Sequence, residues 1–93
     1  EHLYKSIKHP NVEEYMNVGK YAEIFRLPVS PNSKLSNRKI KDIGLPKKSL
    51  IVAVERDSKF IIPTEDVELF SGDKVTVLAH KDQVDRVAAL FSE

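Results

Sequence analysis

The stretch "VERDSKFIIPTEDVELFSGD", residues 54–73, decides how this chain is read, because it places six carboxylates between two apolar runs. They form either an acid/base or metal site, or the turns between strands. A catalytic pair requires both carboxylates in one pocket beside an apolar wall that raises the pKa of one of them. The stretch supplies neither an aromatic wall nor a partnering base, so the pattern favours turns. The six acidic residues are Glu55, Asp57, Glu65, Asp66, Glu68 and Asp73.

Two turns are predicted within this stretch. Asp57 and Ser58 separate two β-rich runs, which is typical of a hairpin. The "SGD" sequence predicts a second turn before a strand, since Gly72 tolerates a positive φ and the Asp73 carboxylate accepts backbone N–H groups. Arg56 is then either a ligand-binding residue or the ion-pair partner of Asp57 or Asp73.

Strands are predicted on both sides of these turns. The "SLIVAVERD" run is almost continuously apolar and β-branched, so we expect both of its faces to be covered. "DKVTVLAH" alternates, with Val75, Val77 and Ala79 on one side. "YAEIFRLPV" also alternates, and Pro28 ends it or places it at an edge. These three strands are expected within residues 49–57, 73–80 and 21–29.

Helices are expected at both ends and before the "SLIVAV" run. The opening residues 1–19 predict a helix that breaks at Pro10 and a short second helix that Asn11 caps and Gly19 ends. Asn37 is expected to cap a single helical turn that ends at Gly44 and Pro46. The closing segment predicts an amphipathic helix capped by Asp82, with one apolar face. That face holds Val84, Val87, Ala88 and Phe91.

Composition limits the class of protein. The 93 residues suit one domain, with 41% hydrophobic residues, 31% charged residues and a net charge of +1. This balance argues against nucleic acid as a partner, because phosphate binding needs a concentrated basic face.

The absence of cysteine leaves self-association as a source of extra stability. No membrane-length apolar run or signal peptide is present. The chain opens without Met inside a predicted helix, so we expect it to be part of a longer protein.

No catalytic, metal or cofactor site emerges from the motifs. The histidines His2, His9 and His80 are scattered, and metal binding needs converging ligands. Three glycines provide no phosphate-binding loop, and the serines lack a nucleophile elbow. We therefore expect no enzyme. The basic stretch from Lys34 to Lys48 is either a solvated loop or a surface that meets phosphate, anionic lipid or an acidic partner.

Four landmarks, in this order and spacing, resemble the C-terminal lobe of RCK domains, the TrkA-C type domain of prokaryotic potassium uptake and channel regulators. They are "SKLSNRKIKDIGLP", "LIVAVERD", "FIIP", and "ELFSGDKVTVLAH" followed by the closing helix. The resemblance covers about Tyr21 to Phe91. The family often has glycine where Asn37, Ser58 and Glu65 stand. Asn37 tolerates a left-handed backbone, and the other two residues suggest slightly different turns.

The resemblance implies an α+β fold with a small, mainly antiparallel sheet and helices, and a homodimer. It implies a non-enzymatic regulatory lobe that senses a small ligand, without a cofactor, for a membrane-embedded potassium channel or transporter subunit. The domain is expected over residues 21–93, after a helical lead-in or linker over residues 1–20. A location in the cytoplasm, at or tethered to the inner membrane, is implied as well. Without the family, the exposed-strand pattern of "SLIVAV" also favours a partner copy.

A small anionic ligand is expected near the approach to the "SLIVAV" strand. Some relatives bind cyclic di-AMP through an Arg and an Asn that Gly44, Ser49 and Leu50 replace here, and this departure argues against cyclic di-AMP. Alternatives are a module fused to another transporter or to a transcription factor, or a nucleic-acid-binding domain that uses residues 34–48. The predicted ligand-binding residues are Lys47, Lys48, Ser49, Leu50, Ile51, Arg56 and Pro63.

Overall fold

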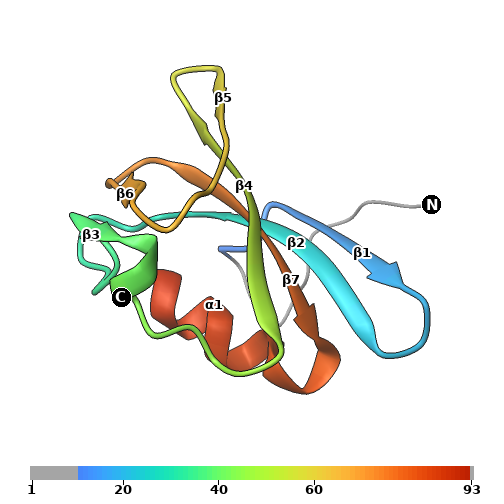
Figure 1. The fold of residues 1–93 in the computed structure, drawn as a ribbon. Coiled ribbons are helices and arrows are strands. Elements are labelled where there is room, and N and C mark those ends of the chain that lie inside the picture. The colour runs from blue at the N-terminus through green and yellow to red at the C-terminus, as the bar shows by residue number, and fades with distance from the viewer. Residues whose placement is uncertain (1–10, 93) are drawn as a thin grey trace.

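The computed structural model describes residues 11–92, and its centre is a five-stranded antiparallel sheet in the order β1-β2-β7-β4-β5 (Figure 1). A separate two-stranded sheet pairs β3 with β6. This confirms the expected α+β class with a mainly antiparallel sheet. The strands are β1 (Glu14–Val18), β2 (Ala22–Pro28), β3 (Arg38–Lys39), β4 (Ser49–Arg56), β5 (Lys59–Ile61), β6 (Glu68–Leu69) and β7 (Lys74–His80). The helices are η1 (Ile40–Asp42), η2 (Lys81–Gln83) and α1 (Val84–Ser92).

The core lies between the sheet and α1, which Figure 1 shows on one side of the strands. Alternate residues of β2 and β7 point to this side, as the period of two requires. The expected apolar face of α1 is confirmed, because all four of its residues are buried. The buried residues from these elements are Phe25, Leu27, Val75, Val77, Ala79, Val84, Val87, Ala88 and Phe91.

Strand β4 is covered on one face only, within the part of the chain that is described. Ile51 and Val54 are buried, although they are three residues apart, because a bulge between Ile51 and Ala53 inserts one residue into the β4–β7 pairing. Leu50 on the other face is 57% exposed. Within residues 11–92 the expected cover on both faces is therefore not found, since α1 packs against a single side of the sheet.

The short helix expected after Asn11 is wrong, because Glu14–Val18 forms the edge strand β1. It pairs with β2 from Glu14 opposite Arg26 to Val18 opposite Ala22. A helix this short is marginal in water, whereas β2 offers backbone partners along its whole edge. Gly19, at φ 64°, supplies the tight turn between the two strands. The helix expected before Pro10 lies outside the described residues, and the domain boundary at residue 20 stays a prediction.

Both predicted side-chain caps differ from those in the structure. Asn37 adopts φ 67° and caps nothing; η1 begins after Lys39 without a side-chain cap. Its left-handed backbone agrees with the glycine that the related domains have at this turn. Before α1, His80 caps the 3-10 turn η2, because its Nδ1 accepts the Asp82 N–H at 3.2 Å. Asp82 lies inside η2, the 3-10 turn that precedes α1, so Asp82 does not cap the helix.

The two predicted turns are confirmed. Asp57 and Ser58 have φ values of 52° and 65° and connect β4 to β5 as a two-residue hairpin. Two consecutive positive φ angles define the type I′ turn, which matches the twist of the flanking strands. Gly72 has φ 91° at the turn before β7.

Candidate functional site

The opening acidic stretch folds around Arg56 and Asp73. The Arg56 Nε and Nη2 atoms each donate to one carboxylate oxygen of Asp73 at 2.8 Å, and Nη2 also donates to the Glu68 carbonyl at 2.8 Å. The Asp73 carboxylate, only 2% exposed, also accepts the Phe70 N–H at 2.8 Å. The pair joins the end of β4 to the β6–β7 turn, and this is the structural alternative that the sequence left open for Arg56.

Arg56 is further held by an aromatic ring. Its guanidinium carbon lies 4.8 Å from the Phe70 ring centroid, a favourable cation–π geometry. The hydrogen bonds to Asp73 raise the pKa of Arg56 above its ordinary value, so the side chain stays charged. With its Nε and Nη2 hydrogens directed at protein acceptors, Arg56 has less freedom to reach a ligand. Its role as a ligand-binding residue stays a prediction.

Three of the predicted ligand residues line one hollow of about 350 Å³ at the beginning of β4. Lys48, Ser49 and Leu50 lie in this hollow next to the beginning of β2 and the end of β7. A hydrogen bond from the His80 N–H to the Lys48 carbonyl, at 2.9 Å, holds the two segments together. The other lining residues are Tyr21, Ala22, Leu78, Ala79 and His80.

The hollow combines aromatic rings with positive charge. The Tyr21 and His80 rings stack with centroids 6.4 Å apart and planes 22° apart. The Lys81 Nζ lies 5.8 Å from the Tyr21 centroid, and the Lys48 ammonium adds a second cation. The Ser49 hydroxyl donates to the Pro46 carbonyl, so its oxygen is left to accept. Such a surface suits a small anion that carries a flat ring.

The remaining predicted ligand residues lie elsewhere. Ile51 is buried in the core at 5% exposure, and Arg56 lies at the far end of β4. Pro63 follows β5, and Lys47 is exposed beside the hollow without lining it. The sequence reading missed Tyr21 and His80, because their proximity depends on the pairing of Ala22 with His80 between β2 and β7. No pattern within a short stretch of sequence predicts the pairing of Ala22 with His80.

The basic stretch does not form one cationic face. Arg38, Lys39 and Lys41 line a separate hollow of about 590 Å³, together with Asp42 and Glu68. The Lys41 ammonium lies 3.2 Å from Asp66. Lys48 belongs instead to the hollow at the beginning of β4. The positive charges are therefore divided between two hollows. In the hollow lined by Arg38, Lys39 and Lys41, carboxylates partly neutralise them.

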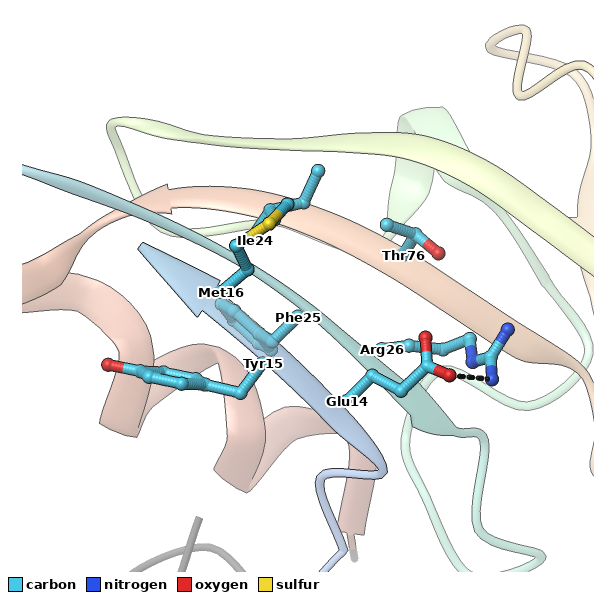
Figure 2. Close-up of a pocket in the computed structure, with 7 residues that line it drawn as sticks. All are labelled: Glu14, Tyr15, Met16, Ile24, Phe25, Arg26 and Thr76. Atoms are coloured by element: carbon cyan, nitrogen blue, oxygen red, sulfur yellow. Dashed lines mark ion pairs between the residues drawn. The ribbon is translucent and has the colours of Figure 1, made fainter. Parts of the chain in front are cut away.

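The face of the sheet opposite α1 carries an apolar row bordered by ion pairs. Figure 2 shows Met16 beside Ile24 on this face, and Glu14 paired with Arg26 near Thr76. The Arg26 Nη2 lies 2.8 Å from Glu14, and Nη1 lies 3.4 Å from Glu55. Around these residues the sheet holds a pocket of about 170 Å³.

These carboxylates do not form a metal site. Among residues 11–92, no group of three or more His, Cys, Asp or Glu side chains converges as metal ligands would. The Glu13 carboxylate is held by the Lys74 ammonium at 2.9 Å, in the same network as Arg26.

No helix in the described part of the chain is both long and apolar enough to span a bilayer.

A five-stranded antiparallel sheet with one C-terminal helix is the architecture of a lobe of the RCK C-terminal type. The chain belongs to the TrkA-C domain family, whose model matches residues 24–92. Domains of this family are regulatory and are related to potassium uptake systems. The resemblance seen in the sequence is thereby confirmed.

Relatives and solved structures agree with this assignment. The Trk system potassium uptake protein TrkA homolog of Methanothermobacter thermautotrophicus is 32% identical over 98% of this chain and 42% of its own length. The homolog of Archaeoglobus fulgidus is 30% identical over 64% of this chain and 14% of its own length. This chain therefore spans less than half of each of these two relatives.

Two solved structures share the fold. The GsuK RCK domain has a TM-score of 0.67 and 19% identity, over 78% of this chain and 16% of that chain. The RCK_C domain dimer of S. agalactiae BusR in complex with c-di-AMP has a TM-score of 0.64 and 24% identity, over 73% of this chain and 93% of that chain. At these identities the likeness concerns the fold.

Proposed function

We propose that this chain is a homodimeric, ligand-sensing regulatory lobe of a potassium uptake or channel system. It acts without catalysis, in the cytoplasm, on a membrane-embedded channel or transporter subunit. Ligand binding shifts the populations of two conformations of the lobe, and the membrane partner responds to that shift. The hollow at the beginning of β4 is the observation that carries the ligand-sensing part, because it gathers three predicted ligand residues around two stacked rings.

The proposed ligand is a small anion with a planar ring, such as a nucleotide. Lys48 and Lys81 supply the positive charge, and the Tyr21–His80 pair supplies a stacking surface. A BusR dimer of the same fold has been solved with c-di-AMP, which supports this ligand class. The loss of the relatives' Arg and Asn at Gly44 and Ser49 argues for a different member of the class.

A thermal-shift screen of nucleotides, cyclic dinucleotides and inorganic anions tests the proposal. A ligand that binds only the folded state stabilises it by about 2.7 kcal/mol at 100 times its dissociation constant. We expect one nucleotide-class compound to raise the melting temperature, and the Lys48→Ala and His80→Ala variants to lose most of that shift. Lys34→Ala is the matched control, since Lys34 is exposed in the same basic stretch but away from the hollow.

Two results would overturn the ligand-sensing proposal. One is a screen in which no compound shifts the melting temperature. The other is a shift that Lys34→Ala removes as completely as Lys48→Ala does, because that points to non-specific binding of anions to the basic stretch.

A second candidate is a sensor module fused to a transcription factor. The S. agalactiae BusR structure in complex with its busAB-promotor DNA has a TM-score of 0.64 over 95% of this chain and 39% of that chain, at 21% identity. This lobe's divided basic stretch does not itself favour DNA. Binding of the lobe to random DNA with a steep salt dependence would support a direct nucleic-acid function, and no binding at low salt would oppose it.

A further inference from the structure

Among the described residues that line the hollow at the beginning of β4, His80 is the one whose charge can change near neutral pH. Imidazole changes charge between about pH 5 and pH 8, whereas lysine and tyrosine side chains titrate near pH 10. The His80 side chain is only 26% exposed. Its charge therefore acts on its neighbours with less screening by water than the charge of a fully exposed group.

The hydrogen bond to His80 fixes which ring nitrogen can take up a proton. Nδ1 accepts the Asp82 N–H at 3.2 Å, so in the neutral ring the hydrogen lies on Nε2. The Asp82 carboxylate oxygen Oδ2 lies 3.4 Å from the same Nδ1. Protonation of Nδ1 exchanges one partner for the other, because the Asp82 N–H is released and the carboxylate accepts the new N–H. The imidazolium thus has a counter-ion in the residue that capped the neutral ring.

The other charges around His80 favour the neutral ring while the hollow is empty. Glu23 pairs with Ala79, so alternation places it on the other face of the sheet. The only nearby carboxylate in residues 11–92 that pairs with His80 is that of Asp82, which is 72% exposed and therefore screened. Two ammonium groups oppose protonation. The titratable groups come from three elements: Tyr21 before β2, Lys48 before β4, and Lys81 and Asp82 in η2.

We propose that His80 is a third, proton-dependent cation of this hollow, and that an anion binds there together with a proton. The inference rests on the proposed ligand-sensing function and adds how the same site is regulated. A bound anion offsets the two ammonium groups and places negative charge beside the imidazole, so it favours the imidazolium. Because coupling between two binding events is reciprocal, protonation of His80 must tighten the binding of the anion by the same factor.

The sign of the pH dependence follows from this coupling. The additional affinity is complete at a pH where His80 is already protonated in the free chain. It is lost as the pH rises until His80 is neutral even in the complex. Couplings between two sites change affinity by about 5- to 150-fold. The hollow is open to water, so we expect the low end, about fivefold tighter binding at pH 6 than at pH 8.

NMR titration of the isotope-labelled chain with two anions tests the inference. Sulfate and 3′,5′-cyclic AMP are the probes, because neither changes its own charge between about pH 5 and pH 8, the range in which imidazole titrates. Cyclic AMP adds the planar ring. We expect both probes to bind about fivefold more tightly at pH 6 than at pH 8. The nitrogen resonances of the His80 ring should move toward those of imidazolium when either probe is added at constant pH.

Substitutions assign the effect, since the chain has three histidines. His80→Asn replaces Nδ1 with an amide oxygen that can accept the Asp82 N–H but takes up no proton. Its affinity falls overall because the stacked ring is lost, so the readout is the ratio of the dissociation constants at the two pH values, expected to be about 1. The double variant His2→Gln, His9→Gln is the matched control and should keep the full pH dependence.

A second variant tests the role of the counter-ion. Asp82→Asn keeps the backbone N–H that His80 accepts but removes the carboxylate 3.4 Å from Nδ1. The imidazolium is then less stable, so the gain in affinity at pH 6 should shrink. An unchanged gain would show that the proton is not held between His80 and Asp82, and would overturn the inference.

The outcomes separate this inference from the proposed function. Equal affinities at the two pH values in the unmodified chain overturn the proton-dependent cation and leave the ligand-sensing lobe standing. A pH dependence that His80→Asn retains, or that the double variant loses, places the proton on another residue and overturns the inference as well. If neither probe binds at either pH, both the inference and the proposed anion site are contradicted.

Discussion

Asp73 shows how one residue of an acidic stretch acquires a structural role. Its carboxylate is almost fully buried and accepts hydrogen bonds from Arg56 and from the Phe70 backbone. A buried carboxylate without such partners costs several kcal/mol. The Arg56–Asp73 pair therefore fixes the β6–β7 turn against the end of β4. The exposed acids Glu65 and Asp66 have no comparable burial.

Replacing Asp73 with Asn is expected to lower the free energy of unfolding by about 2–4 kcal/mol, because the charged acceptor of three donors becomes a neutral amide. Urea denaturation measures this loss as a lower midpoint. Asp66→Asn is the control: its ion pair with Lys41 lies at the surface, where such pairs contribute about 0–1 kcal/mol. Equal losses of unfolding free energy in the two variants would contradict a structural role for the Arg56–Asp73 pair.

At the scale of elements, the β4–β5 hairpin carries strain in its turn. Asp57 and Ser58 both adopt a left-handed backbone, which costs a residue with a Cβ roughly 1–2 kcal/mol. Asn-Gly is the preferred pair for a type I′ turn, and the related domains often have glycine where Ser58 stands. The backbone therefore adopts a type I′ turn, but Asp57 and Ser58 are not the residues that stabilise such a turn best.

The double variant Asp57→Asn, Ser58→Gly is expected to raise the free energy of unfolding by about 0.5–1 kcal/mol, since it relieves the turn without altering a core contact. Thermal or urea unfolding reports the gain. Lys59→Gly, one residue along in exposed β5, should instead cost about 0.5–1 kcal/mol. A loss of stability in the double variant would show that the turn is not strained as described.

At the scale of the whole molecule, the sheet has one face in the core and one face with an apolar row. A small chain of this kind buries a limited fraction of its surface. The proposed homodimer adds apolar burial that the single chain lacks. Stability and association are then linked, because a dimer that unfolds to separate chains depends on concentration.

The melting temperature of the unmodified chain should rise by about 3–5 °C for each tenfold increase in protein concentration. Tenfold in concentration is about 1.4 kcal/mol per dimer, or half of that per chain, and 1 kcal/mol shifts a domain of this size by about 4–8 °C. Scanning calorimetry at two concentrations measures the rise. A concentration-independent transition in the unmodified chain would contradict the linkage.

Much of the fold could be predicted from local patterns. Alternation identified β2 and β7, the β-branched run identified β4, and the apolar spacing identified the buried face of α1. Turn chemistry located Gly72 and the Asp57–Ser58 hairpin. The candidate site was predicted only in part, because Lys48, Ser49 and Leu50 are contiguous in sequence, whereas Tyr21 and His80 join them through strand pairing.

The sequence by itself determined the strands, the turns and the closing helix, because periodicity and φ preferences act over a few neighbouring residues. Only the tertiary structure decided that Glu14–Val18 is an edge strand, since a five-residue segment adopts the conformation that its partner stabilises. It also decided that Arg56 binds Asp73, and that within residues 11–92 the core covers only one face of β4. Each of these depends on which segments meet in space, and that follows from the register of the whole sheet.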